Sequence, residues 1–225
     1  MRVREGLWLA VALLGLVPDA VRSEDVPRES CAFLTVAKTA LEQKAGRPDD
    51  TARALGANIR TVKGAPFDLR GGGMALRAGE QLRFASAEFV FAGEGGIAST
   101  MHKDMGPLAF YAVQEAYLLH GVTGVSSDKI VGRLVFEYED GSTVGEDLVL
   151  GENIGSPTVP AEWAKMVTNG FCVTTVQNPV TYEELTFEPG KGHALKSLTV
   201  SVSNKELTYR VAAITCKLGR QRVHE

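Results

Sequence analysis

The feature of the sequence that most limits the fold is a succession of short apolar runs separated by turn residues. From Ile59 onward these runs have the length of β-strands and are rich in Val, Phe, Tyr, Thr and Leu. Glycine-rich or Asp-Gly turns lie between them, as at residues 71–73, 140–141 and 189–192. Many short strands with little helix predict a β-sandwich or barrel.

Two of the runs alternate strictly between apolar and polar residues, which is typical of a strand with one buried face. The apolar positions are Leu198, Val200 and Val202 in one run and Leu134, Phe136 and Tyr138 in the other. The dipeptide Asp140-Gly141 tolerates positive φ angles and predicts a tight hairpin after the second of these runs. Residues 203–205 predict another hairpin between the last two strands.

Residues 24–58 differ from the rest of the chain. Residues 32–36 fit a short strand and also a helix that continues through Leu41, and Asp50 is a candidate helix cap. We expect an irregular N-terminal segment with a turn or two of helix that packs on a domain at residues 59–218, followed by a tail at 219–225. The predicted fold is all-β: a two-sheet antiparallel jelly roll or β-sandwich with this short irregular or helical N-terminal segment.

The first 23 residues have the pattern of a secretory signal peptide. Arg2 and Arg4 precede an apolar run at residues 7–17, Pro18 ends that run, and cleavage is expected after Ser23. The alternative is an uncleaved membrane anchor, but the run is shorter than the roughly 20 residues that span a bilayer. We therefore expect a periplasmic or secreted protein.

The charge of the exported chain argues against some partners. Cleavage removes three basic and two acidic residues, which changes the formal net charge from −3 to about −4. No basic stripe stands out, so we expect no nucleic-acid partner. No second segment is apolar enough to span a membrane, so no transmembrane segment is expected after signal cleavage.

Three cysteines follow the signal peptide: Cys31, Cys172 and Cys216. Their wide spacing fits no zinc-binding pattern, in which ligands come in close pairs. In an oxidising compartment Cys31 and Cys216, near the two ends of the exported chain, are candidates for a disulfide. The alternative is three buried thiols.

Motifs with catalytic chemistry are missing. The sequence has no G-x-S-x-G elbow, no H-E-x-x-H helix, no phosphate-binding loop and no dinucleotide fingerprint. We expect no catalytic residue, no metal site and no cofactor, with a structural calcium ion left open. The protein is therefore predicted not to be an enzyme, and a glycoside hydrolase with an unrecognised site is the alternative.

Four residues are candidates for ligand binding: His120, Glu152, Asn153 and Trp163. His120 ends an apolar run, where it could instead fix a strand end through backbone hydrogen bonds. Glu152 and Asn153 lie in a glycine-bounded loop, where turn chemistry or a structural cation is the competing role. Trp163 could stack on a sugar, because the apolar face of a sugar packs on aromatic rings, or it could fill the core.

Five short motifs occur in an order that resembles secreted bacterial galactose-binding-like jelly-roll domains, found alone or appended to glycoside hydrolases. They are GAPFDL (64–69), YLLH (117–120), FEYEDGS (136–142), GENIG (151–155) and AAIT (212–215). The resemblance implies an antiparallel jelly roll with a non-catalytic, carbohydrate-binding role. The sequence thus predicts an exported binding or accessory module whose partner is a glycan or another cell-envelope polymer. The alternative is a structural or docking subunit that binds another exported protein.

Overall fold

A computed structural model describes residues 25–91, 111–160, 165–167, 170–178 and 195–220. The expected signal peptide, Trp163 and most of the expected tail lie outside these residues. No helix within the described ranges is long and apolar enough to cross a membrane.

Strands dominate the described chain, and its helices are short. The helical elements are η1 (Arg28–Ser30), α1 (Val36–Gln43), α2 (Asp50–Arg53) and η2 (Ser86–Glu88). The first seven strands are β1 (Cys31–Leu34), β2 (Arg47–Asp49), β3 (Ile59–Val62), β4 (Ala65–Asp68), β5 (Gly73–Leu76), β6 (Gln81–Ala85) and β7 (Phe89–Phe91). The others are β8 (Tyr111–Gly124), β9 (Ile130–Tyr138), β10 (Thr143–Val149), β11 (Lys165–Met166), β12 (Phe171–Gln177), β13 (Leu195–Val202) and β14 (Leu207–Arg220).

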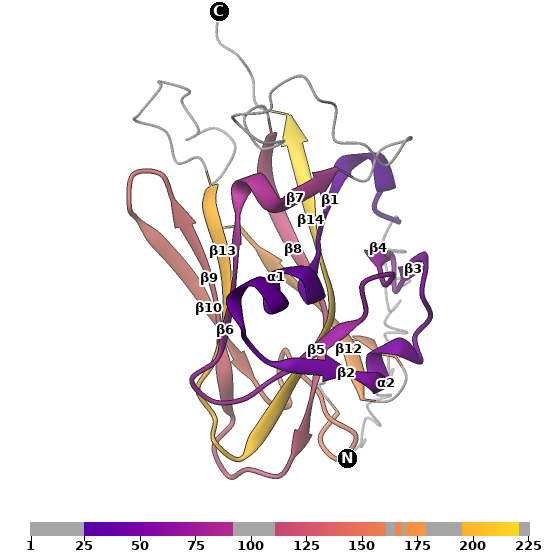
Figure 1. Ribbon diagram of the computed structural model, residues 1–225, viewed down its shortest axis with the longest axis vertical. Helices are drawn as coiled ribbons and strands as arrows, with labels where there is room; N and C mark the ends of the chain where they lie inside the picture. The colour runs from indigo at the N-terminus through magenta and orange to yellow at the C-terminus, as the bar shows by residue number, and fades with distance from the viewer. Residues whose placement is uncertain (1–24, 92–110, 161–164, 168–169, 179–194, 221–225) are drawn as a thin grey trace, which may run out of the picture.

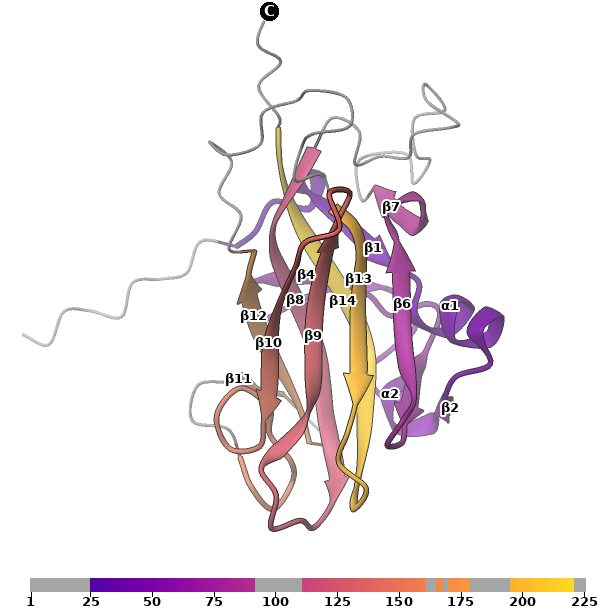
Figure 2. The ribbon, with the colours of Figure 1, turned by 90° about the vertical axis from the view of Figure 1, so that its left-hand side faces the viewer.

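Two antiparallel sheets pack face to face, which confirms the predicted β-sandwich (Figure 1). The larger sheet has the order β11-β12-β8-β14-β1-β7, and β5 and β2 extend it beside the other half of β14. The smaller sheet has the order β10-β9-β13-β6, and Figure 2 shows these four strands side by side.

The chain passes repeatedly from one sheet to the other. Strands β5, β8, β12 and β14 belong to the larger sheet, whereas β6, β9, β10 and β13 belong to the smaller one. The resulting orders, β5-β14-β8-β12 and β6-β13-β9-β10, are those of an eight-stranded jelly roll. Neighbouring strands are therefore mostly distant in sequence, and the loops between strands gather at the two ends of the sandwich.

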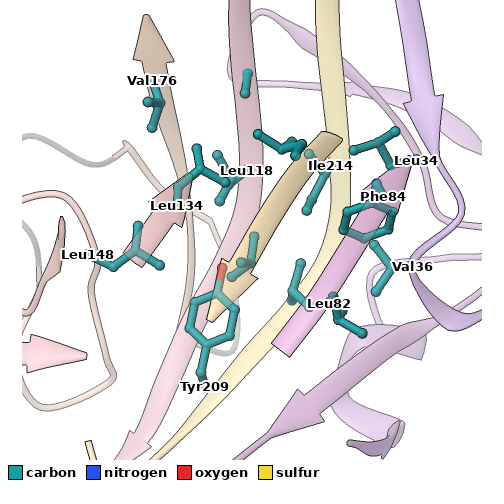
Figure 3. Packing of buried hydrophobic residues seen from close by; sticks show 14 of the residues in the cluster. Leu34, Val36, Leu82, Phe84, Leu118, Leu134, Leu148, Val176, Tyr209 and Ile214 are labelled. Atoms are coloured by element: carbon teal, nitrogen blue, oxygen red, sulfur yellow. The ribbon is translucent and has the colours of Figure 1, made fainter. Parts of the chain in front are cut away.

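The main core lies between the sheets and is formed by the alternating apolar positions of their strands (Figure 3). All six positions that the two-residue period singled out, in β9 and in β13, are buried there. Glu137, which alternates with them, points to the outer side and accepts hydrogen bonds from Arg83, Lys196 and Ser197. Periodicity thus predicted correctly which faces of these two strands are buried.

The N-terminal segment contributes strands β1 and β2 to the larger sheet of the sandwich. Strand β1 pairs with β14 on one side and with β7 on the other, because its four residues are all buried apolar groups. Thr35 then separates β1 from α1, so the two alternatives for this stretch are both realised, one after the other. Helix α1 buries Val36 and Ala40 in the main core and closes one side of the sandwich.

A second apolar cluster covers the outer face of the larger sheet. There α2 and the β3–β4 hairpin pack over side chains of β8, β12 and β14, and Phe67 of β4 is fully buried. Gly73 permits this approach, because a Cβ atom there would lie 2.5 Å from the Cβ of Ala52 in α2. Asp49, rather than the expected Asp50, caps α2 by accepting a hydrogen bond from the backbone N–H of Thr51.

One of the two predicted hairpins is confirmed and the other is wrong. Strands β9 and β10 pair across a turn in which Gly141 has a φ of 84°, as Asp140-Gly141 predicted. Strands β13 and β14 do not pair, because β13 lies between β9 and β6 in the smaller sheet while β14 lies in the larger one. Residues 203–206 therefore connect the two sheets.

Candidate functional site

Four loops meet at the lower end of the sandwich in Figure 2, and we call this region the loop end. It consists of residues 77–80, 125–129, 150–160 and 203–206. Backbone hydrogen bonds tie these loops together: Gly79 donates to Val202, Leu150 to Lys129, and Val122 to Gly155. Loops held on a rigid scaffold are a common place for binding residues, so the loop end is the candidate site.

Asn204 fixes two of these loops from a buried position. Its Nδ2 donates to the Ser126 hydroxyl and to the carbonyl oxygens of Asp128 and Ile130, at 3.0–3.2 Å. Its Oδ1 accepts from two backbone N–H groups at the start of β14. One side chain thereby satisfies backbone groups of both the 125–129 and the 203–206 loops, so the loop end has a defined shape.

Asn153 lies in the loop end, but its amide is used to hold the structure together. Its Oδ1 accepts from the Val149 N–H at 2.7 Å, while its Nδ2 donates to the Asp147 carbonyl at 2.8 Å and to the Glu146 carboxylate at 3.1 Å. These contacts cover the end of edge strand β10, as a neighbouring strand would. A ligand would have to displace them in order to bind this amide.

Glu152 stands beside Asn153 and is the more accessible of the two. Its side chain is exposed, and within the described chain its carboxylate forms no hydrogen bond or ion pair. The structure thus brings Glu152 and Asn153 to one end of the sandwich, as expected, with only Glu152 open to a partner.

His120 lies beneath the loop end with an exposed fraction of 0%. Its Nε2 is 2.8 Å from the Thr174 hydroxyl, and its Nδ1 is 3.0 Å from the Tyr209 hydroxyl. The Thr174 hydroxyl itself donates to the carbonyl oxygen of Asn153. A chain of hydrogen bonds therefore runs from Tyr209 in the core to the backbone of the loop end.

This network assigns the tautomer of His120. Because the Thr174 hydroxyl donates its proton to Asn153, it accepts from Nε2–H, and Nδ1 is left to accept from the Tyr209 hydroxyl. Burial lowers the pKa of His120 from 6.5 to about 3, so the ring is neutral near pH 7. The ring has no exposed surface and both of its nitrogens are engaged, so the geometry favours the structural alternative for His120 over a ligand-binding role.

Trp163, the fourth predicted ligand residue, lies outside the described residues. The aromatic side chains that the structure does describe are all buried: Phe33, Phe67, Phe84, Phe89, Tyr117, Phe136, Tyr138, Phe171 and Tyr209. None of them offers an exposed ring on which a sugar could stack.

The predicted disulfide between Cys31 and Cys216 is not formed. Residues opposite each other in an antiparallel pair share a face, and Cys216 lies opposite Ala32 rather than Cys31. Cys216 therefore points into the main core, whereas Cys31 points to the outer face with Phe33. Burial raises the pKa of the Cys216 thiol well above its usual value, which makes it a poor nucleophile.

Within the described ranges, no three His, Cys, Asp or Glu side chains come close enough together to hold a metal ion. The open question of a structural calcium ion stays a prediction. Sequence reasoning missed the partners of His120, since Thr174 and Tyr209 lie 54 and 89 positions away and no local pattern links them. It also missed Asn204, although an Asn in a connecting loop is a common hydrogen-bonding hub.

Comparison with protein families, with curated proteins and with solved structures found no match to this chain.

Proposed function

We propose that the protein is an exported, non-catalytic accessory module that docks another exported protein through its loop end. Export rests on the signal-peptide pattern of the first 23 residues. The observation that carries the docking proposal is the loop end, where a hydrogen-bonded frame presents exposed aliphatic side chains.

Three large apolar side chains protrude from this end: Val125, Ile130 and Val159. Val125 has an exposed fraction of 82%, the highest among the described large apolar residues. The exposed carboxylate of Glu152 and the exposed Lys129 supply charge around them. Apolar groups beside exposed charges match the general composition of protein interfaces.

A glycan partner is the second candidate. The strand order supports it, because it has the order of a jelly roll, which is the fold that the resemblance to galactose-binding-like domains implies. Burial of the described aromatic side chains favours protein docking instead, because sugar sites use exposed aromatic faces. A hydrolase receives less support, since the sequence carries none of the recognised catalytic motifs.

The proposal is tested by in vivo cross-linking of the exported protein, followed by purification of the cross-linked partner and a binding measurement. We expect the double variant Val125→Asp/Val159→Asp to bind that partner at least about tenfold more weakly, because charge at a desolvated contact is costly. The matched control is Leu41→Asp, which changes an apolar residue of α1 that is 71% exposed and does not belong to the loop end.

A glycan array with the same proteins separates the two candidates. Docking predicts no saturable glycan binding by the wild-type chain. Glycan binding that is lost in Glu152→Gln and kept in Leu41→Asp would replace protein docking with a carbohydrate-binding function. Equal loss of protein partner in both apolar variants would also contradict the loop-end site.

A further inference from the structure

A cavity of about 290 Å³ lies on the outer face of the larger sheet, and none of its described lining residues belongs to the loop end. Its walls are the β3–β4 hairpin and the loop after α2, and Figure 1 shows both on the same side of the molecule. Its floor includes Leu119 of β8 and Val167. The volume lies at the lower end of the range of small-molecule sites.

The interior of this cavity is apolar. Leu55, Leu69 and Leu119 are buried at its base, and Val62 and Val167 are half-buried around it. These residues belong to the cluster that joins the N-terminal segment to the larger sheet. A bound molecule would therefore need an apolar body in order to displace water from this surface.

The rim of the cavity is basic. Arg60 and Lys63 line it, and none of the described lining residues is acidic. In the hairpin register Arg60 lies opposite Phe67, whose side chain packs on the sheet, so Arg60 projects from the sheet-facing side of β3. Lys63 occupies the turn with a φ of 53° and Gly64 follows with a φ of 88°, which makes a two-residue hairpin with a defined turn.

Arg60 is held in place by one hydrogen bond, and within the described residues no other acceptor engages its guanidinium. Its Nη1 donates to the Leu55 carbonyl at 2.7 Å, which ties β3 to the loop after α2. Among the described carboxylates, none forms an ion pair with Arg60 or Lys63. Two cations over an apolar hollow complement an anionic head group attached to an apolar body, and the guanidinium fork suits a carboxylate.

We propose that this cavity is a binding site for a small monocarboxylate with an apolar chain. The chain lies against the half-buried side chains of Val62 and Val167 and the small exposed part of Leu55, and the carboxylate is bound by Arg60 and Lys63 at the rim. The site is separate from the loop end, so it stands whether or not the docking function is correct.

Titrations with three probes, followed by amide NMR shifts, test the proposal. Sodium octanoate carries both features, octanamide lacks the charge, and sodium acetate lacks the chain. We expect saturable octanoate binding with shifts at the β3–β4 hairpin and at Leu119. Binding of octanamide should be at least about tenfold weaker, because a charge-assisted hydrogen bond is lost. Acetate should not saturate.

Variants locate the site on the chain. Arg60→Gln should weaken octanoate binding about tenfold or more, and Val62→Phe should abolish it by filling the cavity, with thermal melts confirming the fold of each. Lys205→Gln, which removes an exposed cation from the loop end, is the matched control and should bind octanoate normally. Equal binding of octanoate and octanamide, shifts confined to another face, or unchanged affinity in Arg60→Gln would overturn the proposal.

Discussion

Arg210 and Asp49 are 161 positions apart in the chain, yet the Arg210 Nε donates a hydrogen bond to the Asp49 Oδ2 over 2.8 Å in a buried contact. Asp49 also accepts from the backbone and the hydroxyl of Thr51. The Arg210 guanidinium lies over the ring of Phe171, 4.2 Å from its centre. The ion pair therefore joins the N-terminal segment to β14, and the contact between Arg210 and Phe171 extends the connection to β12 of the larger sheet.

Breaking this ion pair should destabilise the fold strongly, because the remaining partner would be a buried charge. We expect Asp49→Asn, which keeps a capping side chain, and Arg210→Met each to lower the free energy of unfolding by about 3–5 kcal/mol. The double variant should cost clearly less than the sum of the two single changes. Urea denaturation of all four proteins measures this, and simple additivity would contradict a coupled pair.

The buried His120 makes stability depend on pH. Its pKa is about 3 in the folded protein and near 6.5 when the chain is unfolded, so the unfolded state binds more protons between these values. The contribution of neutral His120 to the free energy of unfolding is therefore fully present above pH 6.5 and is lost as the pH falls below that value. Between pH 6.5 and 5, above the range in which most carboxylates titrate, the free energy of unfolding should fall by about 2 kcal/mol.

Urea unfolding curves at several pH values check this dependence on His120. In His120→Gln the slope between pH 6.5 and 5 should largely disappear, although the variant is less stable overall. An unchanged slope would show that another group titrates in this window.

Gly121 of β8 should be intolerant of a side chain, because it lies where β12 and β14 meet β8. A Cβ atom at this position would be 2.1 Å from the Gly170 carbonyl oxygen, which is a backbone atom and cannot simply rotate away. We expect Gly121→Ala to lower the free energy of unfolding by about 1–3 kcal/mol. Gly71→Ala is the control: its Cβ would meet nothing closer than 3.9 Å, so thermal melts should show little change.

Asn153 and Glu152 are adjacent, and the structure gives them opposite roles. Asn153→Ala removes three side-chain hydrogen bonds at the end of β10 and should cost about 1–3 kcal/mol of stability. It should also promote self-association, because it uncovers part of an edge strand. Glu152→Ala should leave stability within about 0.5 kcal/mol. Urea midpoints and light scattering compare the two, and equal effects would contradict this assignment.

The side chains that cover the edge strands of the smaller sheet show which contacts local sequence can predict and which it cannot. On the opposite edge of the smaller sheet, the Gln43 side chain of α1 donates to the Arg83 carbonyl and accepts from the Arg83 N–H in β6. Nothing in the local sequence of either residue indicates this contact, since they are 40 positions apart. Turn chemistry at Asp140-Gly141, by contrast, is decided by neighbouring residues and was predicted correctly.

The candidate site was predicted only in part for the same reason. The glycine-bounded loop of Glu152 and Asn153 could be recognised, because turn residues reveal connections between strands. The role of each side chain could not be predicted, because it depends on partners elsewhere in the chain. These partners are Thr174 and Tyr209 for His120, and the edge of β10 for Asn153. The Cys31–Cys216 prediction failed because a shift of one residue in register reverses the face to which a side chain points.

The sequence by itself determined the fold class and the buried faces of the strands, because the two-residue period and the turn residues are local properties of the chain. Tertiary structure alone decided that β13 and β14 lie in different sheets, that the N-terminal segment supplies β1, and that Arg60 and Lys63 border an apolar cavity. Each of these depends on which distant segments pack together, and that is settled by the burial of the whole set of apolar faces at once.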